Sequence, residues 1–240
     1  MNTDTLKLSG SERSSPVGSS RTLAVGAAPA LESRLIRPDL GGRLDRDADV
    51  AAGGYVDGGV RGEELIEALG SAGLRGRGGA AFPTAVRMRS VRDRPGSRYL
   101  VANGAEGEPA SVQDRWLLRY RPHLVLDGVM CSAEAVGVER AYVFVSDRAA
   151  SAGVEDAVGE LAAPDVPIEV VVVDSAYVAG EETAVVRAVD GGPALPLDKP
   201  PRPFEVGVEG RPTLIANVPR MSLPTRCDDT SRERDTDHPG

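Results

Sequence analysis

Short apolar runs alternate with longer amphipathic stretches through the middle of this 240-residue chain. Short apolar runs bounded by turn residues are typical of buried strands, whereas apolar positions three and four apart indicate helices. The pattern predicts strands at residues 99–102, 141–145, 168–173 and 213–216. It predicts helices at residues 63–69, 83–91, 114–137 (broken at Pro122), 151–161 and 180–189. This alternation predicts an α/β fold with a Rossmann-like, mostly parallel sheet and helices on both faces.

The two ends of the chain lack this alternation. Residues 1–58 read as a variable N-terminal region, largely disordered, with irregular chain over 31–59 where Gly-Gly pairs interrupt any period. Residues 59–218 are expected to form the α/β domain. Residues 219–240 hold many charges and few apolar positions, so we expect a disordered tail.

Composition narrows the class of protein. Aromatic residues are 4% of the chain, so Val, Ala, Leu and Ile must build the core. The net charge of −8 argues against a nucleic-acid partner. No apolar run could cross a membrane and the polar N-terminus is no secretory signal, so we expect a cytoplasmic protein without direct membrane insertion. The two cysteines, Cys131 and Cys227, cannot supply four thiolates, and no metal site is expected.

One segment departs from the overall acidity. Between Ser71 and Arg98 there are seven Arg residues and one acid, Asp93. One interpretation is a solvated basic helix face. The other is a site for a compact anion, because glycines at 76, 78 and 79 would let the backbone approach a phosphate that Arg neutralises. These glycines formally match G-x-G-x-x-[GA], but they follow a helical segment instead of a strand, so we reject the ordinary dinucleotide fingerprint.

Polar loops follow the predicted strands, where ligands bind in open α/β sheets. Residues 103–109 place two carboxylates in a Gly-containing turn, and residues 177–183 place two acids at a helix start. Asn217 follows the last strand. Each feature has a structural alternative. Residues 103–109 could form an exposed acidic turn, and the acids at 177–183 could reflect the ordinary preference for negative charge at a helix N-terminus. Asn217 could be an ordinary turn residue.

Three further features favour structural roles. His123, next to Pro122, is interpreted as a helix-start residue instead of a catalytic base, and no catalytic side chain is assigned. Cys131 lies in an apolar helical run and is expected in the core. Trp116 and Tyr120 are spaced i, i+4 and are expected to pack together.

Four motifs occur in order, at residues 73–84, 103–109, 180–184 and 213–218. Together they resemble the NADH-binding flavoprotein subunit of respiratory complex I and related subunits of NAD-linked hydrogenases, formate dehydrogenases and Rnf complexes. The resemblance implies a non-standard Gly-rich loop that cradles the FMN phosphate, with hydride transfer from NADH to FMN as the chemistry. It also implies partner subunits of a redox complex.

The resemblance assigns site residues by position in these motifs. The implied cofactor-binding residues are Gly76, Arg77, Gly78, Arg87, Asn103, Glu106, Tyr177, Gly180, Glu181 and Asn217. The implied NADH-facing residues are Phe82, Glu108 and Glu182. Paired acids near the nicotinamide would favour NADH by repelling the 2′-phosphate of NADPH.

The chain also departs from the family pattern. Ala105 replaces a usual Asp, Met88 replaces a usual Trp, and Ser90 stands where a further aromatic is expected, which would reduce an aromatic platform for adenine. After Val218 the family pattern of a ubiquitin-like domain and a [4Fe–4S] domain does not follow, so no cluster is expected in this chain.

Two other functions are weighed against a flavin oxidoreductase. The first is a truncated, non-catalytic remnant that binds flavin or nucleotide without passing electrons. The second is an RNA-binding segment at residues 75–79, against which the overall acidity and the lack of RGG repeats argue.

Overall fold

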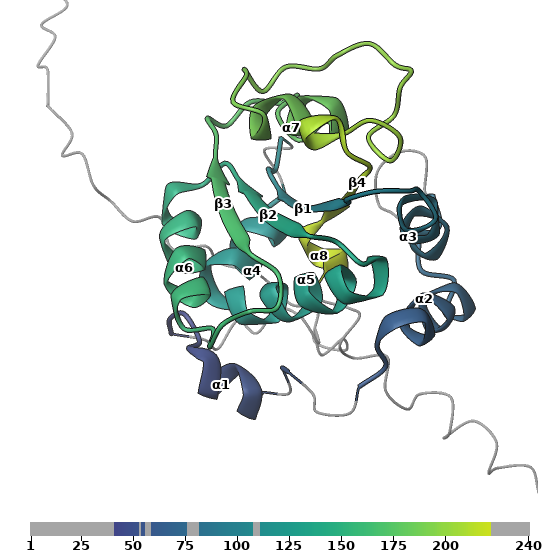
Figure 1. Cartoon of the computed structure of the whole chain (residues 1–240). Coiled ribbons are helices and arrows are strands. Elements are labelled where there is room, and N and C mark those ends of the chain that lie inside the picture. The colour runs from purple at the N-terminus through teal and green to yellow at the C-terminus, as the bar shows by residue number, and fades with distance from the viewer. Residues whose placement is uncertain (1–40, 53, 56–58, 76–81, 108–110, 222–240) are drawn as a thin grey trace, which may run out of the picture.

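A parallel sheet lies at the centre of the computed structural model, which describes residues 41–52, 54–55, 59–75, 82–107 and 111–221 (Figure 1). Its strands within these residues are β1 (Tyr99–Gly104), β2 (Arg140–Val145), β3 (Ile168–Val172) and β4 (Thr213–Asn217). They lie in the order β3-β2-β1-β4, and every neighbouring pair is parallel. The predicted α/β fold with a parallel sheet is confirmed.

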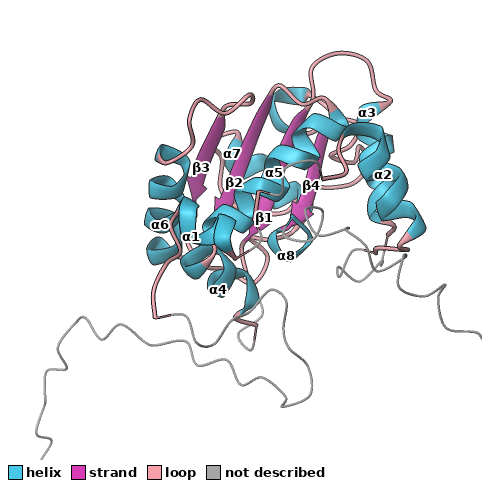
Figure 2. Cartoon of the chain, turned by 90° about the horizontal axis from the view of Figure 1, so that it is seen from below, coloured by secondary structure: helices cyan, strands magenta, loops and turns pink. Residues whose placement is uncertain are grey.

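Helices cover both faces of the sheet, as predicted. The connections from β1 to β2 and from β2 to β3 run through α4 (Gln113–Tyr120), α5 (Pro122–Val136) and α6 (Arg148–Gly159). The connection from β3 to β4 runs through α7 (Glu182–Val189) and lies on the opposite face (Figure 2). The helices α2 (Gly62–Ser71) and α3 (Thr84–Arg92) pack together, and α3 contacts the edge strand β4.

Side-chain alternation along the strands divides the core into two layers. Leu100 and Ala102 of β1 belong to the layer shared with α4, α5 and α6. Tyr99 and Val101 belong to the layer shared with α7. The first layer is the larger, and the second rests on the single helix α7 with the short turn η1 (Val208–Gly210).

Several local predictions are confirmed. The predicted helix over 114–137 is broken at Pro122 into α4 and α5. The rings of Trp116 and Tyr120 pack with centroids 5.3 Å apart. Cys131 is a buried core residue. The strand β1 extends further than predicted, because Asn103 and Gly104, which we assign to a turn, continue the ladder to β2.

The segment predicted as irregular chain and the start of the predicted disordered tail contain helices, which corrects the sequence analysis there. Residues 1–40 and 222–240 of the two predicted terminal regions lie outside the described residues. Helix α1 (Arg46–Ala51) lies inside the 31–59 segment and is capped by Asp45, whose side chain accepts a hydrogen bond from the Ala48 N–H. Helix α8 (Val218–Met221) extends beyond the predicted domain end. It packs on α5 because Gly128 has no side chain: an added Cβ would lie 1.4 Å from the Met221 carbonyl oxygen.

A buried ion pair holds the segment around α1 against the rest of the fold. The Arg121 guanidinium donates to Asp49 Oδ1 from Nε at 2.9 Å and from Nη2 at 2.7 Å. The two side chains are 1% and 0% exposed. Asp49 Oδ2 is buried and accepts no hydrogen bond from any residue that the structure describes. Two charges removed from water depend on each other, so neither can be deleted alone at low cost.

A second polar chain joins the same segment to α5 and α6. His123, the second residue of α5, is fully buried, and its ring nitrogens contact the Tyr55 hydroxyl at 2.9 Å and Glu160 Oε2 at 2.8 Å. Glu160 also forms an ion pair with Arg43. The interpretation of His123 as a helix-start residue is confirmed, and its ring links the Tyr55 hydroxyl to the Glu160 carboxylate.

We predict that Arg121→Met destabilises the fold by about 3–5 kcal/mol, because it leaves the Asp49 carboxylate buried without its partner. The free energy of unfolding from urea titration measures the effect. The matched double variant Asp49→Leu/Arg121→Met replaces both charges by apolar groups and should recover most of the loss. A free energy of unfolding for Arg121→Met within about 1 kcal/mol of the wild-type value would show that the buried Asp49 carboxylate does not depend on Arg121.

A second prediction concerns acid stability at Glu160. The hydrogen bond from Arg43 holds the pKa of Glu160 at about 2, below its ordinary value of 4.5. The carboxylate therefore stabilises the fold fully above pH 4.5, and this contribution is lost as pH falls through about 2. Its side chain is 31% exposed, so screening limits the contribution to about 1 kcal/mol.

The comparison of wild type with Glu160→Gln tests this linkage. Urea titrations at a series of pH values should show a stability difference at neutral pH that shrinks between pH 4.5 and 2. A difference that stays constant with pH would mean that the variant acts through packing alone.

Candidate functional site

The carboxyl ends of β1 and β4 form the switch point of the sheet. From β1 the chain passes to β2 on one side, whereas β4 returns on the other side. Asn103 of β1 and Asn217 of β4 are direct partners in the register. Crevices outside such switch points are the usual ligand sites of open α/β sheets, and this one presents two neighbouring carboxamides.

Two loops predicted to carry chemistry meet at this edge. The Asn103 side-chain amide donates to the Gly180 carbonyl at 2.9 Å. A Cβ added at Gly180 would lie 2.7 Å from the Ala105 carbonyl oxygen. A Cβ added at Gly107 would lie 2.3 Å from the Tyr177 carbonyl oxygen. Glycine at both positions lets the loop after β1 contact the loop before α7 through backbone atoms.

Glu106 has a structural role that sequence reasoning missed. Its side chain is 4% exposed. Its carboxylate accepts hydrogen bonds from the backbone N–H groups of Asp114 and Arg115, at 3.0 and 3.3 Å, and from Arg115 Nε at 3.0 Å. These N–H groups belong to the first turn of α4, so Glu106 caps that helix from seven positions before its start.

Glu181 caps α7 in a similar way. Its carboxylate accepts from the N–H groups of Thr183 and Ala184 at 2.8 and 3.2 Å. Lys199 Nζ contacts Glu181 at 2.5 Å and Glu182 at 2.8 Å. Although partial burial opposes it, the hydrogen bonds from Lys199 and Thr183 hold the pKa of Glu181 below its ordinary value. Hydrogen bonds to the two acids raise the pKa of Lys199 in spite of desolvation. Both acids are thus paired with a cation outside the sequence motifs.

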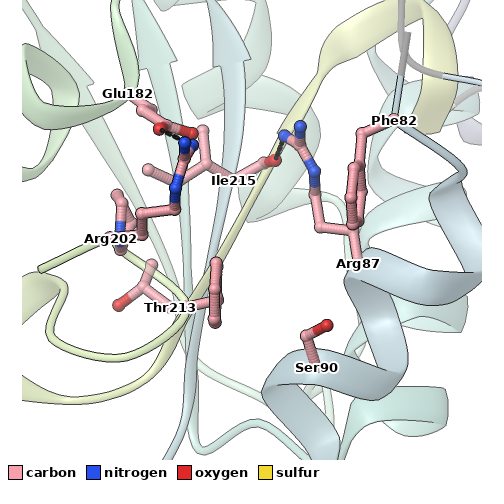
Figure 3. A pocket seen from close by; sticks show the side chains of 9 residues that line it. Phe82, Arg87, Ser90, Glu182, Arg202, Thr213 and Ile215 are labelled. Atoms are coloured by element: carbon pink, nitrogen blue, oxygen red, sulfur yellow. Dashed lines mark hydrogen bonds and ion pairs between the residues drawn. The ribbon is translucent and has the colours of Figure 1, made fainter. Parts of the chain in front are cut away.

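A pocket of about 320 Å³ lies beside the edge strand β4 (Figure 3). One wall comes from α3 and from Phe82, two residues before its start, and the other from α7 and the segment before η1. Its lining comprises Phe82, Arg87, Ser90, Glu182, Arg202, Pro203, Phe204, Thr213 and Ile215. Arg87 Nη1 donates to the Ile215 carbonyl at 2.9 Å, which fixes the guanidinium at the pocket wall.

The structure brings together most of the predicted site residues that it describes. Phe82, Arg87 and Glu182 line the pocket, whereas Asn103, Gly180 and Asn217 lie at the switch point. Tyr177 is 77% exposed in the loop before α7. Sequence reasoning missed Lys199, Arg202 and Phe204, which stand outside the motifs in a proline-rich stretch without periodicity.

Four predicted site residues, Gly76, Arg77, Gly78 and Glu108, lie outside the described residues. The base of the Gly/Arg loop is described, however. Arg75 forms an antiparallel bridge with Pro83, and the Thr84 N–H donates to the Leu74 carbonyl at 2.9 Å. The loop therefore leaves and returns at one point, at the start of α3 and next to Phe82 of the pocket.

Comparison with known proteins agrees with this geometry. Residues 69–222 match the family described as the Nuo51 FMN-binding domain, Complex1_51K. The chain is 34% identical over 170 residues to an NADH-quinone oxidoreductase subunit of Aquifex aeolicus, covering 65% of this chain and 40% of that protein. It is 32% identical over 185 residues to the mitochondrial NADH-ubiquinone oxidoreductase 51 kDa subunit of Neurospora crassa, covering 68% and 37%.

A solved structure of an NAD⁺-reducing [NiFe]-hydrogenase in the H₂-reduced state is also similar, with a TM-score of 0.62 and 34% identity. The match covers 68% of this chain and 30% of the hydrogenase chain. This chain thus spans about two fifths of the length of the curated relatives it matches.

Within the described residues, no helix is long and apolar enough to cross a membrane. The same residues contain no cluster of His, Cys, Asp and Glu arranged to hold a metal ion.

We predict that Gly180→Ala destabilises the protein by about 1–3 kcal/mol, because the new methyl group would overlap the Ala105 carbonyl. Gly159→Ala is the matched control: nothing lies within 4 Å of its added Cβ, and it should be neutral or stabilising in the last turn of α6. Urea denaturation of both variants checks the contrast. Equal stabilities would show that the two loops do not need this close approach.

Proposed function

Because the chain belongs to the family of the Nuo51 FMN-binding domain, we propose that it binds FMN at the β1/β4 switch point and oxidises NADH there. The observation that carries this proposal is the convergence of the 103–107 and 177–180 loops, tied by the Asn103–Gly180 hydrogen bond. The relatives named above include NADH-quinone oxidoreductase subunits and an NAD⁺-reducing hydrogenase, which supports the same reaction class.

The residues present fit a flavin mononucleotide. The exposed Asn217 amide offers a donor and an acceptor for a polar ring edge or a ribityl chain. The Asn103 amide is buried, donates one N–H to the Gly180 carbonyl and accepts from the Ala105 N–H, so its second N–H and second lone pair would meet the ligand. Gly107 and Gly180 keep the loops free of side chains where they meet. The Gly/Arg loop, with Gly76, Arg77 and Gly78, would neutralise the phosphate, together with the Arg87 guanidinium.

Bound FMN supplies the hydride acceptor, and the chain supplies placement. Tyr177 would cover the ligand from the solvent side, as its exposed ring allows. Glu106 and Glu181 contribute by capping α4 and α7, which fixes the loops that present Asn103 and Gly180. The two acids thus act in this proposal mainly as positioning residues.

NADH would enter through the pocket beside β4. At 320 Å³ the pocket lies at the lower end of the range for ligand sites, so it suits one half of a dinucleotide. Phe82 and Phe204 offer apolar faces for the adenine, and Glu182 lies at the wall formed by α7. Glu108, in the loop after β1, would face the nicotinamide half.

Partners and compartment follow from the same assignment. Subunit relatives in complex I and in a hydrogenase support an association with other subunits of a redox complex. We also propose a cytoplasmic location, consistent with the low cysteine content of the chain.

Titration of the purified chain with FMN, followed by anaerobic addition of NADH, tests the proposal. We expect stoichiometric binding and loss of the visible flavin absorbance. Arg77→Gln should weaken FMN binding about 10- to 100-fold, because a charge-assisted contact is worth about 1.5–3 kcal/mol. Arg148→Gln, an exposed site at the start of α6, is the matched control and should bind normally. Binding without bleaching would favour the non-catalytic remnant instead.

A further inference from the structure

Two parts of the chain face each other across the pocket beside β4. Phe82 and Arg87 stand on the α3 side, and Arg202 stands opposite, on the segment before η1 (Figure 3). Phe204 belongs to the same segment and also lines the pocket. Because these two sides lie far apart in the sequence, the shape of the pocket depends on the contacts that hold one side against the other.

Arg94 is one residue that makes such a contact. It lies two residues after the end of α3, and its guanidinium carbon is 5.7 Å from the centroid of the Phe204 ring. Its Nη2 donates to Glu205 Oε1 at 3.3 Å. A cation over an aromatic face is attracted by the electrons of the ring, and the neighbouring ion pair keeps the guanidinium at that face. One side chain from the α3 side thus holds two consecutive residues of the opposite segment.

The backbone of Arg94 is anchored at both of its polar groups. Its N–H donates to the Val91 carbonyl at 3.1 Å. Its carbonyl accepts two hydrogen bonds from the Arg98 guanidinium, from Nε at 3.0 Å and from Nη2 at 2.7 Å. The Arg94 side chain therefore extends from a fixed base on the α3 side.

The Phe204 ring depends on contacts of its side chain. The backbone next to it is tied to β4, because the Thr213 N–H donates to the Pro203 carbonyl at 2.9 Å. This bond leaves rotation about the side-chain bonds of Phe204 open. The residue is half-buried at the margin of the larger core layer, so the guanidinium over its ring restricts a side chain that the core encloses only in part.

We propose that Arg94 is a positioning residue, which holds the Phe204 ring in the pocket wall so that the adenine of the dinucleotide meets a preformed apolar face. The inference rests on the proposed function, which places the adenosine half in this pocket. A ring that is ordered before the ligand arrives costs binding less conformational entropy than a mobile one. Arg94 does not belong to the pocket lining, so it acts on the ligand through Phe204.

Fluorine NMR of the full chain labelled with 3-fluorophenylalanine tests the position of the ring. The chain contains three Phe residues, of which Phe82 and Phe204 line the pocket and Phe144 is buried in β2. The spectrum of Phe204→Leu assigns the Phe204 resonance. We expect Arg94→Gln to shift this resonance and to leave that of Phe144 in place. Arg89→Gln is the matched control, because it removes the same charge from α3 outside the pocket lining, and it should shift neither.

Titration of the same samples with adenosine measures binding without flavin and without turnover. Adenosine carries no charge, so a long-range electrostatic effect of the lost guanidinium leaves its affinity unchanged. Arg94→Gln should weaken adenosine binding about two- to ten-fold, as expected for a lost cation–π contact. Arg94→Lys keeps a cation near the ring and should retain most of the affinity, and Arg89→Gln should bind adenosine as the wild type does.

The outcomes separate this inference from the proposed function. An unmoved Phe204 resonance or an unchanged adenosine affinity in Arg94→Gln would overturn the role of Arg94 and leave the pocket assignment intact. A weaker affinity for 5′-AMP with an unchanged affinity for adenosine would show a long-range charge effect, which also overturns the positioning role. A wild-type chain that binds no adenosine would overturn both the placement of the adenosine half in this pocket and the inference.

Discussion

The hydrogen bond from the Asn103 amide to the Gly180 carbonyl joins two parts of the chain on which the whole site depends. It connects the carboxyl end of β1 to the loop that leads into α7, across the face of the sheet that α7 covers. The contact is possible because Gly180 and Gly107 have no side chains between the two backbones. With this link in place, the first turn of α7 is held beside β4, and Glu182 reaches the pocket wall.

Three acidic residues at this edge cap helices or pair with cations within the protein: Glu106 in the loop after β1, and Glu181 and Glu182 at the start of α7. Glu106 and Glu181 accept hydrogen bonds from helix N–H groups, so their negative charge stabilises the first turns of α4 and α7. Lys199 pairs with Glu181 and Glu182, and Arg202 approaches Glu182. A motif that looks acidic in the sequence thus builds a crevice whose electrostatics are set by cations that lie outside it.

The strands and their order in sequence followed from hydrophobic pattern alone, because a parallel sheet buried on both faces needs apolar runs such as Ala141–Val145. The loops that carry the site followed from the position of polar residues after those runs. Helix α1 was missed because a six-residue helix has no room for a period, and its stability comes from the distant Arg121. The cations Lys199 and Arg202 were missed because their partners are distant in sequence and no local rule links them.

The edge of the sheet explains why one wall of the pocket is rigid. Strand β4 pairs with β1 on one side only among the described strands, so its outer carbonyls need other partners. Arg87 of α3 donates to the Ile215 carbonyl and satisfies one of them. The same bond orients the guanidinium toward the pocket, at the point where the base of the Gly/Arg loop is closed by the Arg75–Pro83 bridge. Protection of the strand edge and placement of a cation at the pocket wall are therefore one interaction, and a substitution at Arg87 cannot change one without the other.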